Sequence, residues 1–363
     1  MTSTNFSPSA LPDLFKRIAP DVVIPDPFDA PSLRWGILGA GGIARTFARD
    51  VPAYSNQRVV AVGSRDLGRA RAFAEEMGVP AAGAFGSYEE LVAAPDVDAI
   101  YVATPHMRHH DDALLALRAG KPVLVEKSFA MSVAEAQEVF DEASARNLFA
   151  MEGMWSRHLP HYHFIRAAIQ SGSLGNVVKV SADHGQQLTH VPRLTEPALA
   201  GGAMLDLGVY PLSLIQMALG KPKEQSALGR LSDKGIDLGD VVIGKHETGL
   251  SVATCQLDGA SPMRGMLTLA SGVIEMPKNF YQPTKVRLTV GKMDPDTGAM
   301  IGSEESEWDA RVPGGFQYQA AEAARRITAG DLQSPVVPWS ATLEVQQMMD
   351  EALAQVGVSY PKF

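Results

Sequence analysis

A glycine-rich turn near the start of the chain constrains its fold more than any other feature. Residues 33–38 read as a buried strand, and a Gly-x-Gly-x-x-Ala turn over residues 39–44 follows directly. Gly39 permits the tight turn, Gly41 lets the backbone approach a pyrophosphate, and Ala44 allows close helix–strand packing. A second strand follows at residues 58–63, at βαβ spacing. The segment therefore predicts a dinucleotide turn with phosphates at the helix N-terminus; the alternative is a glycine-rich turn in an unrelated α/β domain.

Size and charge narrow the protein class. With 363 residues, the chain is too long for one ordinary core, and we expect two domains. A net charge of −9 argues against nucleic acid and anionic membranes as partners. We expect no apolar run long enough to span a bilayer and no secretory signal in residues 1–10. The single cysteine, Cys255, fits a reducing, cytoplasmic location and a small buried position on a strand.

The order of predicted elements gives three segments. Six prolines make residues 1–31 an arm, with one helical turn near residues 14–18; it either lies across a neighbouring subunit or is a disordered tail. In residues 32–152, strands and helices alternate, which predicts a doubly wound parallel sheet. In residues 153–363, clustered strands predict an α+β domain with a mostly antiparallel open sheet for substrate binding and oligomerisation.

The open sheet predicts an assembly. The helix expected at residues 212–219 covers one face, and few other helices are available for the second. We expect Val252, Leu269, Ile274 and Val286 on that uncovered face. Since soluble monomers rarely expose such patches, the pattern predicts a homodimer or a dimer of dimers.

The end of the second strand bears on the nucleotide. There an NAD enzyme usually places an acid, whereas this chain has Ser64 and Arg65. A hydroxyl and a guanidinium suit a 2′-phosphate, so the sequence favours NADP. Asp66 keeps NAD open, and a solvated surface charge is the alternative interpretation of Arg65.

Two histidine-rich runs, at residues 106–110 and 158–163, raise the question of a metal. Neither has the cysteine spacing of a structural zinc site. We therefore expect surface or hydrogen-bonded core histidines and no metal.

Three residues carry the candidate chemistry. Lys127 follows a predicted parallel strand, and Asp206 and Tyr210 are four residues apart before an expected helix start near Pro211. Oxidising an alcohol needs a base, and a nearby ammonium favours the phenolate of a tyrosine. In reduction, the same pair donates a proton and stabilises an alkoxide. The alternative is a capping aspartate and a core tyrosine.

These motifs resemble the glucose–fructose oxidoreductase and inositol dehydrogenase (Gfo/Idh/MocA) family, from about residue 33 to the end, and within it the dimeric dihydrodiol dehydrogenase and D-xylose dehydrogenase branch. The resemblance implies NADP, a catalytic Lys127–Tyr210 pair and an assisting Asp206. It implies that Trp155 and Arg157 border the nicotinamide or substrate pocket. The residues expected to bind cofactor are Gly39, Gly41, Gly42, Ile43, Ser64, Arg65, Thr104, Pro105, His106, His109, Glu126, Lys127, Trp155 and Arg157.

The chain departs from the family pattern at three positions. The family's Glu-Lys-Pro is Glu126-Lys127-Ser128 here. In relatives the proline peptide can be cis, and a cis bond before serine costs about 3 kcal/mol, so we expect a differently shaped loop. His106 replaces a frequent asparagine, and His158 a frequent aromatic residue, where the substrate is chosen.

The sequence therefore predicts an NADP-dependent oxidoreductase acting on a hydroxyl or carbonyl of a sugar or polyol, first an aldose 1-dehydrogenase of the xylose or glucose type. A trans-dihydrodiol dehydrogenase and a keto-sugar reductase are alternatives. A non-catalytic NAD(P)-binding regulator is the alternative of another class.

Overall fold

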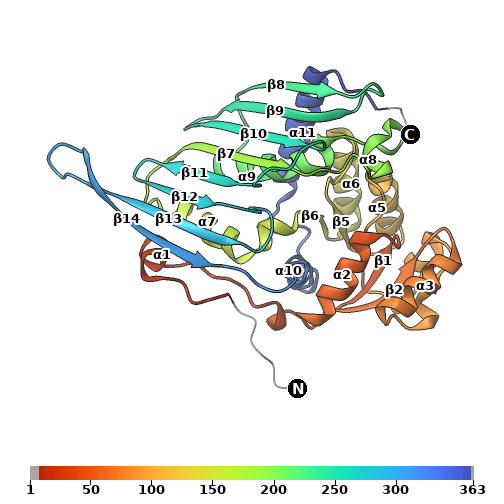
Figure 1. The fold of residues 1–363 in the computed structure, drawn as a ribbon. Coiled ribbons are helices and arrows are strands. Elements are labelled where there is room, and N and C mark those ends of the chain that lie inside the picture. Colours follow the sequence, from red (N-terminus) through yellow and green to blue (C-terminus); the bar gives the residue numbers. More distant parts are fainter. Residues whose placement is uncertain (1–7, 361–363) are drawn as a thin grey trace. The chain divides into compact units, whose positions relative to one another are not determined.

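The computed structural model describes residues 8–360, which fall into two compact units (Figure 1). The parallel unit comprises residues 25–158 and 314–346, and the antiparallel unit comprises the rest. This division differs from a single boundary near residue 152, because α10 (Phe316–Ala329) groups with the parallel unit. Its Ala321 and Ala324 are fully buried in a small cluster with Ala30, which lets the helix pack closely.

A six-stranded sheet with the order β3-β2-β1-β4-β5-β6 forms the centre of the parallel unit. All its neighbouring strands pair in parallel, which confirms the predicted doubly wound sheet. The strands are β1 (Arg34–Leu38), β2 (Arg58–Gly63), β3 (Ala84–Phe85), β4 (Ala99–Val102), β5 (Val123–Glu126) and β6 (Ala150–Gly153). The helices between them are α2 (Gly42–Ala53), α3 (Leu67–Met77), α4 (Tyr88–Val92), α5 (His109–Arg118) and α6 (Val133–Arg146).

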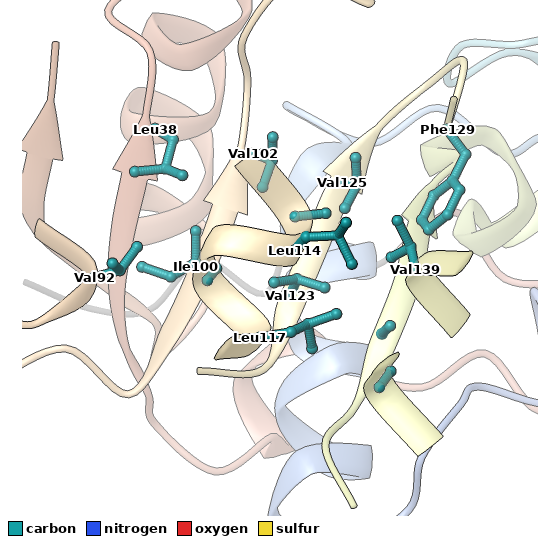
Figure 2. Close-up of a cluster of buried hydrophobic side chains, with 14 of the residues drawn as sticks. Leu38, Val92, Ile100, Val102, Leu114, Leu117, Val123, Val125, Phe129 and Val139 are labelled. Atoms are coloured by element: carbon teal, nitrogen blue, oxygen red, sulfur yellow. The ribbon is translucent and has the colours of Figure 1, made fainter. Parts of the chain in front are cut away.

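Helices on the sheet bury β4 and β5 completely. Figure 2 shows Ile100 and Val102 of β4 and Val123 and Val125 of β5 among side chains of α5 and α6. Such unbroken apolar strands are typical of a parallel sheet covered on both faces. Polar residues are consequently confined to the strand ends, and ligands of this fold bind beyond the carboxyl ends.

The antiparallel unit is built on an eight-stranded sheet with the order β14-β13-β12-β11-β7-β10-β9-β8. Only β7 and β10 pair in parallel, so the prediction of a mostly antiparallel sheet is confirmed. Its strands are β7 (Val177–Gly185), β8 (Glu224–Leu231), β9 (Asp237–Lys245), β10 (Leu250–Gln256), β11 (Gly265–Leu269), β12 (Gly272–Met276), β13 (Lys285–Met293) and β14 (Met300–Asp309). Its longer helices are α7 (Pro160–Ser171), α9 (Val209–Leu219) and part of α11 (Trp339–Val356). Cys255 is a buried free thiol on β10, as predicted.

The two faces of this sheet differ in cover. Leu269, Ile274 and Val286 are buried, so their expected place on an open face was wrong. Alternate residues of a strand point to opposite faces of the sheet. An error of one residue in the assignment therefore places every side chain of that strand on the wrong face. The apolar residues that do face outwards lie mainly on β8, β9 and β10: Leu228, Val241, Ile243, Leu250 and the half-buried Val252.

The described part of the proline-rich arm packs on its own chain. The Phe15 ring of α1 (Asp13–Ile18) lies 4.7 Å from Phe164 and 6.0 Å from Trp308, between centroids. Trp308 Nε1 donates to the carbonyl of Ser9 at 2.7 Å. This segment therefore packs against its own chain and is not a disordered tail, while the predicted arm's residues 1–7 lie outside the described part.

One described segment has the length and apolar composition of a membrane span. It runs over Pro197–Leu219, and its most apolar 18-residue window has a mean hydropathy of 1.5, so the expectation that no run is long enough was wrong. Its most apolar window is 89% buried inside the structure, because α9 and the turns before it cover the open sheet's inner face.

Candidate active site

The glycine turn after β1 leaves its outer side open. Gly39 has φ +103°, and a Cβ there would lie 2.7 Å from the carbonyl oxygen of Ala103, so glycine is required. At Gly41 and Gly42 an added Cβ would meet nothing within 4 Å. Gly41 is the N-cap of α2, and Ile43 is partly exposed beside it. The start of this 12-residue helix therefore has open space beside its two glycines, and a helix N-terminus of this kind suits a phosphate.

After β2, an aspartate caps the next helix and arginine side chains are exposed. Asp66 accepts the N–H of Arg69 at 2.9 Å as the N-cap of α3, while Ser64 is buried and Arg65 is exposed. Burial and Asp112 raise the pKa of the Tyr88 phenol, and the guanidiniums of Arg65, Arg108 and Arg69 oppose the rise. The charges of three arginines therefore act on one phenol here, and Arg108 also pairs with Asp111 and Asp112.

Sequence reasoning found only Arg65 of these three. Arg69 lies on a helix and Arg108 in the turn after β4, and neither belongs to a motif that would have identified it.

The turn after β4 is fixed by His109. Its Nδ1 lies 2.7 Å from the carbonyl of Ser128, and its Nε2 lies 2.8 Å from the carbonyl of Thr104. Burial lowers the pKa of His109 to about 4, although the two carbonyls favour the charged ring. His109 is thus a buried link between the loops that follow β4 and β5. His106 packs edge-on against it, 5.6 Å away between centroids, and Pro105 is exposed.

Two buried carboxyl groups lie at the ends of β5 and β6. Glu126 accepts from the Tyr101 hydroxyl, and Glu152 accepts from Thr342 Oγ1 at 3.1 Å. Burial raises the pKa of each to about 7, while the charge of Lys127 favours both carboxylates. Sequence reasoning identified Glu126 but not Glu152, whose role depends on the long-range contact with α11.

The remaining predicted residues of this unit lie nearby in sequence and space. Arg157 is buried and favours the Glu152 carboxylate electrostatically, and Trp155 stacks on Phe316 at 4.7 Å between centroids. Lys127 is half-buried, and the Lys127–Ser128 peptide is cis.

Asp206 and Tyr210 lie together in the antiparallel unit. Asp206 is in a π-helical turn (Met204–Gly208) that continues directly into α9, whose second residue is Tyr210. Helical geometry places residues four apart on one face, as the spacing predicted. Arg193 Nη1 lies 3.2 Å from Asp206 Oδ1.

Aromatic rings enclose Tyr210. The centroids of His184 and Tyr281 lie 5.2 Å and 4.8 Å from its ring, and Gln186 Nε2 donates to the Tyr281 hydroxyl at 3.3 Å. Burial raises the pKa of Tyr281, and the Asp206 carboxylate adds to this rise. Sequence reasoning missed His184, Tyr281 and Arg193, because β7, the segment before β13 and the short helix α8 (Pro192–Thr195) come together only in the fold.

The predicted cofactor-binding residues thus gather at the strand ends of the parallel unit, and Asp206 and Tyr210 belong to the other unit. Within residues 8–360, no group of three or more His, Cys, Asp or Glu side chains could hold a metal ion. His110 instead contacts Asp111 and Glu138, and His161 contacts the carbonyl of Phe280.

Comparisons with known proteins match both halves of the chain. Residues 33–154 match the Gfo/Idh/MocA oxidoreductase family with an NAD-binding Rossmann fold, and residues 162–274 match the C-terminal domain of that family. The trans-1,2-dihydrobenzene-1,2-diol dehydrogenase of Bos taurus is 35% identical over 91% of this chain and 99% of its own. The D-xylose 1-dehydrogenase (NADP(+)) of Hypocrea jecorina is 34% identical over 91% and 94%, respectively.

Solved structures share the fold. An aldose–aldose oxidoreductase from Caulobacter crescentus superposes with a TM-score of 0.78 at 22% identity, covering 90% of this chain and 98% of that one. A 3-ketoreductase from Actinomadura kijaniata gives 0.75 at 24% identity, with the same coverage. The two family matches, together with relatives above 30% identity over nearly the whole length, show that this chain is an oxidoreductase of the Gfo/Idh/MocA family.

Proposed function

We propose that the protein is an NADP-dependent oxidoreductase that transfers a hydride between nicotinamide and a hydroxyl or carbonyl of a sugar or related polyol. One observation carries the proposal: this chain combines two sets of residues. In the parallel unit, an open glycine turn and Lys127 lie at strand ends, and in the antiparallel unit Asp206 and Tyr210 lie on one helical segment. A bare nucleotide-binding regulator needs only the turn.

Lys127 and Tyr210 are the proposed catalytic pair. Bound NADP supplies the hydride acceptor or donor. The alcohol proton must leave as the hydride does, and a phenol with an ordinary pKa near 10 needs a cation to act as its base at neutral pH. The Lys127 ammonium supplies that charge, and in the reverse direction stabilises an alkoxide. Asp206 and its partner Arg193 orient a substrate hydroxyl.

Two features of the parallel unit support NADP rather than NAD. Asp66, the nearest acid after β2, is committed to capping α3. Arg65, Arg69 and Arg108 all act electrostatically on Tyr88, so the exposed Arg65 lies in a region of positive charge that suits a dianionic 2′-phosphate. The relative from Hypocrea jecorina is itself named for NADP(+).

For the substrate, we propose an aldose oxidised at its anomeric hydroxyl, of the xylose or glucose type. A relative at 34% identity is a D-xylose 1-dehydrogenase. The amides of Gln186 and Gln282 meet at the Tyr281 hydroxyl near Tyr210, and such groups suit a polyhydroxylated ligand. A trans-dihydrodiol is the second candidate because relatives at 32–35% identity carry that activity in their names.

The deciding experiment is a panel of aldoses, inositols and trans-dihydrodiols with NADP and with NAD, followed by the absorbance of the reduced cofactor. We expect the highest kcat/KM for an aldose with NADP. If only the trans-dihydrodiols were turned over, the proposed substrate would change from an aldose to a trans-dihydrodiol. The absence of turnover across the panel, in both directions, would favour the regulator.

We also propose a cytoplasmic homodimer. Leu228 is 80% exposed and Leu250 is 58% exposed, on the uncovered face of a sheet whose other face is covered by α9. Isologous pairing of two such faces would bury this patch. Light scattering at micromolar concentration tests it: Ile243→Glu should give a monomeric mass, and a monomeric parent would refute the dimer.

A further inference from the structure

A hydrogen-bonded assembly in the antiparallel unit holds the segment that carries Asp206 and Tyr210. Asp237, at the start of β9, accepts the N–H of Met204 through Oδ2 at 2.6 Å. Met204 is the first residue of the π-helical turn. Because early N–H groups of a helical segment have no intrahelical acceptor, Asp237 supplies from a distant strand what a capping side chain supplies locally.

The approach of Asp237 requires a glycine at position 202. Gly202 has φ +139°, and an added Cβ would lie 2.0 Å from Asp237 Oδ1. No side chain fits there without moving the carboxyl group. Gly202 therefore allows β9 to reach the backbone of the turn.

A second contact comes from the chain after α11. The Tyr360 hydroxyl donates to the carbonyl of Gly201 at 3.0 Å. The same oxygen would lie 3.0 Å from a Cβ on Gly202, so Tyr360 and Asp237 approach adjacent peptide units. Burial, with Asp237 and Asp240, raises the pKa of the Tyr360 phenol, which keeps it a hydrogen-bond donor.

The carboxyl group of Asp237 is itself held in place. It is fully buried, and Asp240 and Cys255 lie behind it, with Cys255 Sγ 3.5 Å from Asp240 Oδ2. Burial and the neighbouring Asp240 raise the pKa of Asp237. Two carboxyl groups in one buried space favour a shared proton, which removes the repulsion between them.

We infer that Asp237 and Tyr360 are positioning residues for the proposed catalytic segment, Gly201 to Tyr210. They touch neither cofactor nor the reacting atoms; they fix the backbone from which Asp206 and Tyr210 project. The inference rests on the proposed function for its effect on turnover, while its effect on the segment can be measured without any substrate.

The experiment compares Asp237→Ala, Asp237→Asn and Tyr360→Phe, with Tyr318→Phe, a buried tyrosine of the parallel unit, as the matched control. In Asp237→Ala we expect kcat to fall roughly ten- to a hundred-fold with KM for NADP unchanged, because small displacements of catalytic groups are costly. Asp237→Asn keeps an acceptor for Met204 and should restore most of kcat. Tyr360→Phe loses one hydrogen bond, and kcat should fall about three- to ten-fold.

Hydrogen exchange of peptides covering residues 201–210 provides the activity-independent readout. Exchange there should rise in Asp237→Ala and Tyr360→Phe and stay near the parent value in Asp237→Asn and Tyr318→Phe. An Asn variant as impaired as the Ala variant, or unchanged exchange together with unchanged kcat in Tyr360→Phe, overturns the inference. A parent enzyme without turnover overturns the proposed function alone, and exchange still decides the positioning role.

Discussion

The two units each bury a pair of carboxyl groups beside a proposed catalytic residue, but they neutralise them differently. Burial raises the pKa of Glu126 and of Glu152 to about 7, and the positive charge of Lys127 opposes this rise. Asp237 and Asp240 lie against a backbone N–H and a thiol instead. Burial raises the pKa of all four carboxyl groups, but the Lys127 ammonium opposes the rise in the first pair, whereas the neighbouring Asp240 adds to the rise for Asp237. The first pair therefore lies near an ammonium charge, and Asp237 of the second lies against the backbone of the segment that carries Asp206 and Tyr210.

The largest effects should come from the proposed catalytic pair, Lys127 and Tyr210. Lys127→Ala and Tyr210→Phe should each lower kcat by roughly two to four decades, because proton transfer and alkoxide stabilisation contribute that much. NADP binding, measured by fluorescence titration, should stay nearly intact in both. A variant retaining more than about half of the parent rate would remove that residue from the pair.

Stability should respond strongly to the arm. Phe15 is fully buried against Phe164 and Trp308, so Phe15→Ala should destabilise the antiparallel unit by about 3–5 kcal/mol. Denaturant unfolding measures the loss, and Val23→Ala, which alters a 72% exposed side chain of the same segment, is the control. Equal stability of the two variants would mean that the arm contributes nothing to this unit.

What could be predicted differs between the units for a physical reason. In the parallel unit, the glycines of the turn after β1, Ser64 and Lys127 follow their strands directly, so their positions derive from local order alone. In the antiparallel unit, the surroundings of Tyr210 come from β7 and the segment before β13, which only tertiary pairing brings together.

The errors have the same origin. Strands β8, β9 and β14 were not predicted, because exposed polar and apolar residues alternate along them without a strong apolar run. The facing of Ile274 and Val286 depended on register, which no single strand specifies. Glu152 and Asp237 were missed because an isolated acid has no sequence signal for burial; their partners Thr342 and Met204 are 190 and 33 residues away.

The pH dependence of stability should show whether Glu152, of the Glu126–Glu152 pair, titrates near neutral pH. The pKa of Glu152 is about 7 when folded and 4.5 otherwise, so between these values the folded state binds more protons. The contribution of Glu152 to the free energy of unfolding is fully present below pH 4.5. It is lost as pH rises through 7, and the loss amounts to up to about 3 kcal/mol. Glu152→Gln lacks this loss, so its Tm relative to the parent should rise from pH 5 to pH 8, roughly in step with that titration.

Calorimetry of both proteins across this range isolates Glu152, since the buried histidines titrate equally in each. Glu89→Gln, at an exposed site of the same unit, should show no such trend. A constant difference in Tm between Glu152→Gln and the parent would mean that Glu152 is ionised throughout, and the contrast between the two acidic pairs would be lost.

The smallest effect concerns the cofactor end of the parallel unit, where exposed cations replace buried acids. Arg65→Ala should weaken NADP by about 1.5–3 kcal/mol and leave NAD nearly unchanged, because only NADP carries the 2′-phosphate. Arg69→Ala should show a smaller loss of the same sign, because Arg69 also acts electrostatically on Tyr88 but lies on α3 and not at the end of β2. Titrating both cofactors against each variant measures the four affinities. Equal losses of NADP and NAD in Arg65→Ala would make that residue structural, and a parent that prefers NAD would remove the 2′-phosphate site altogether.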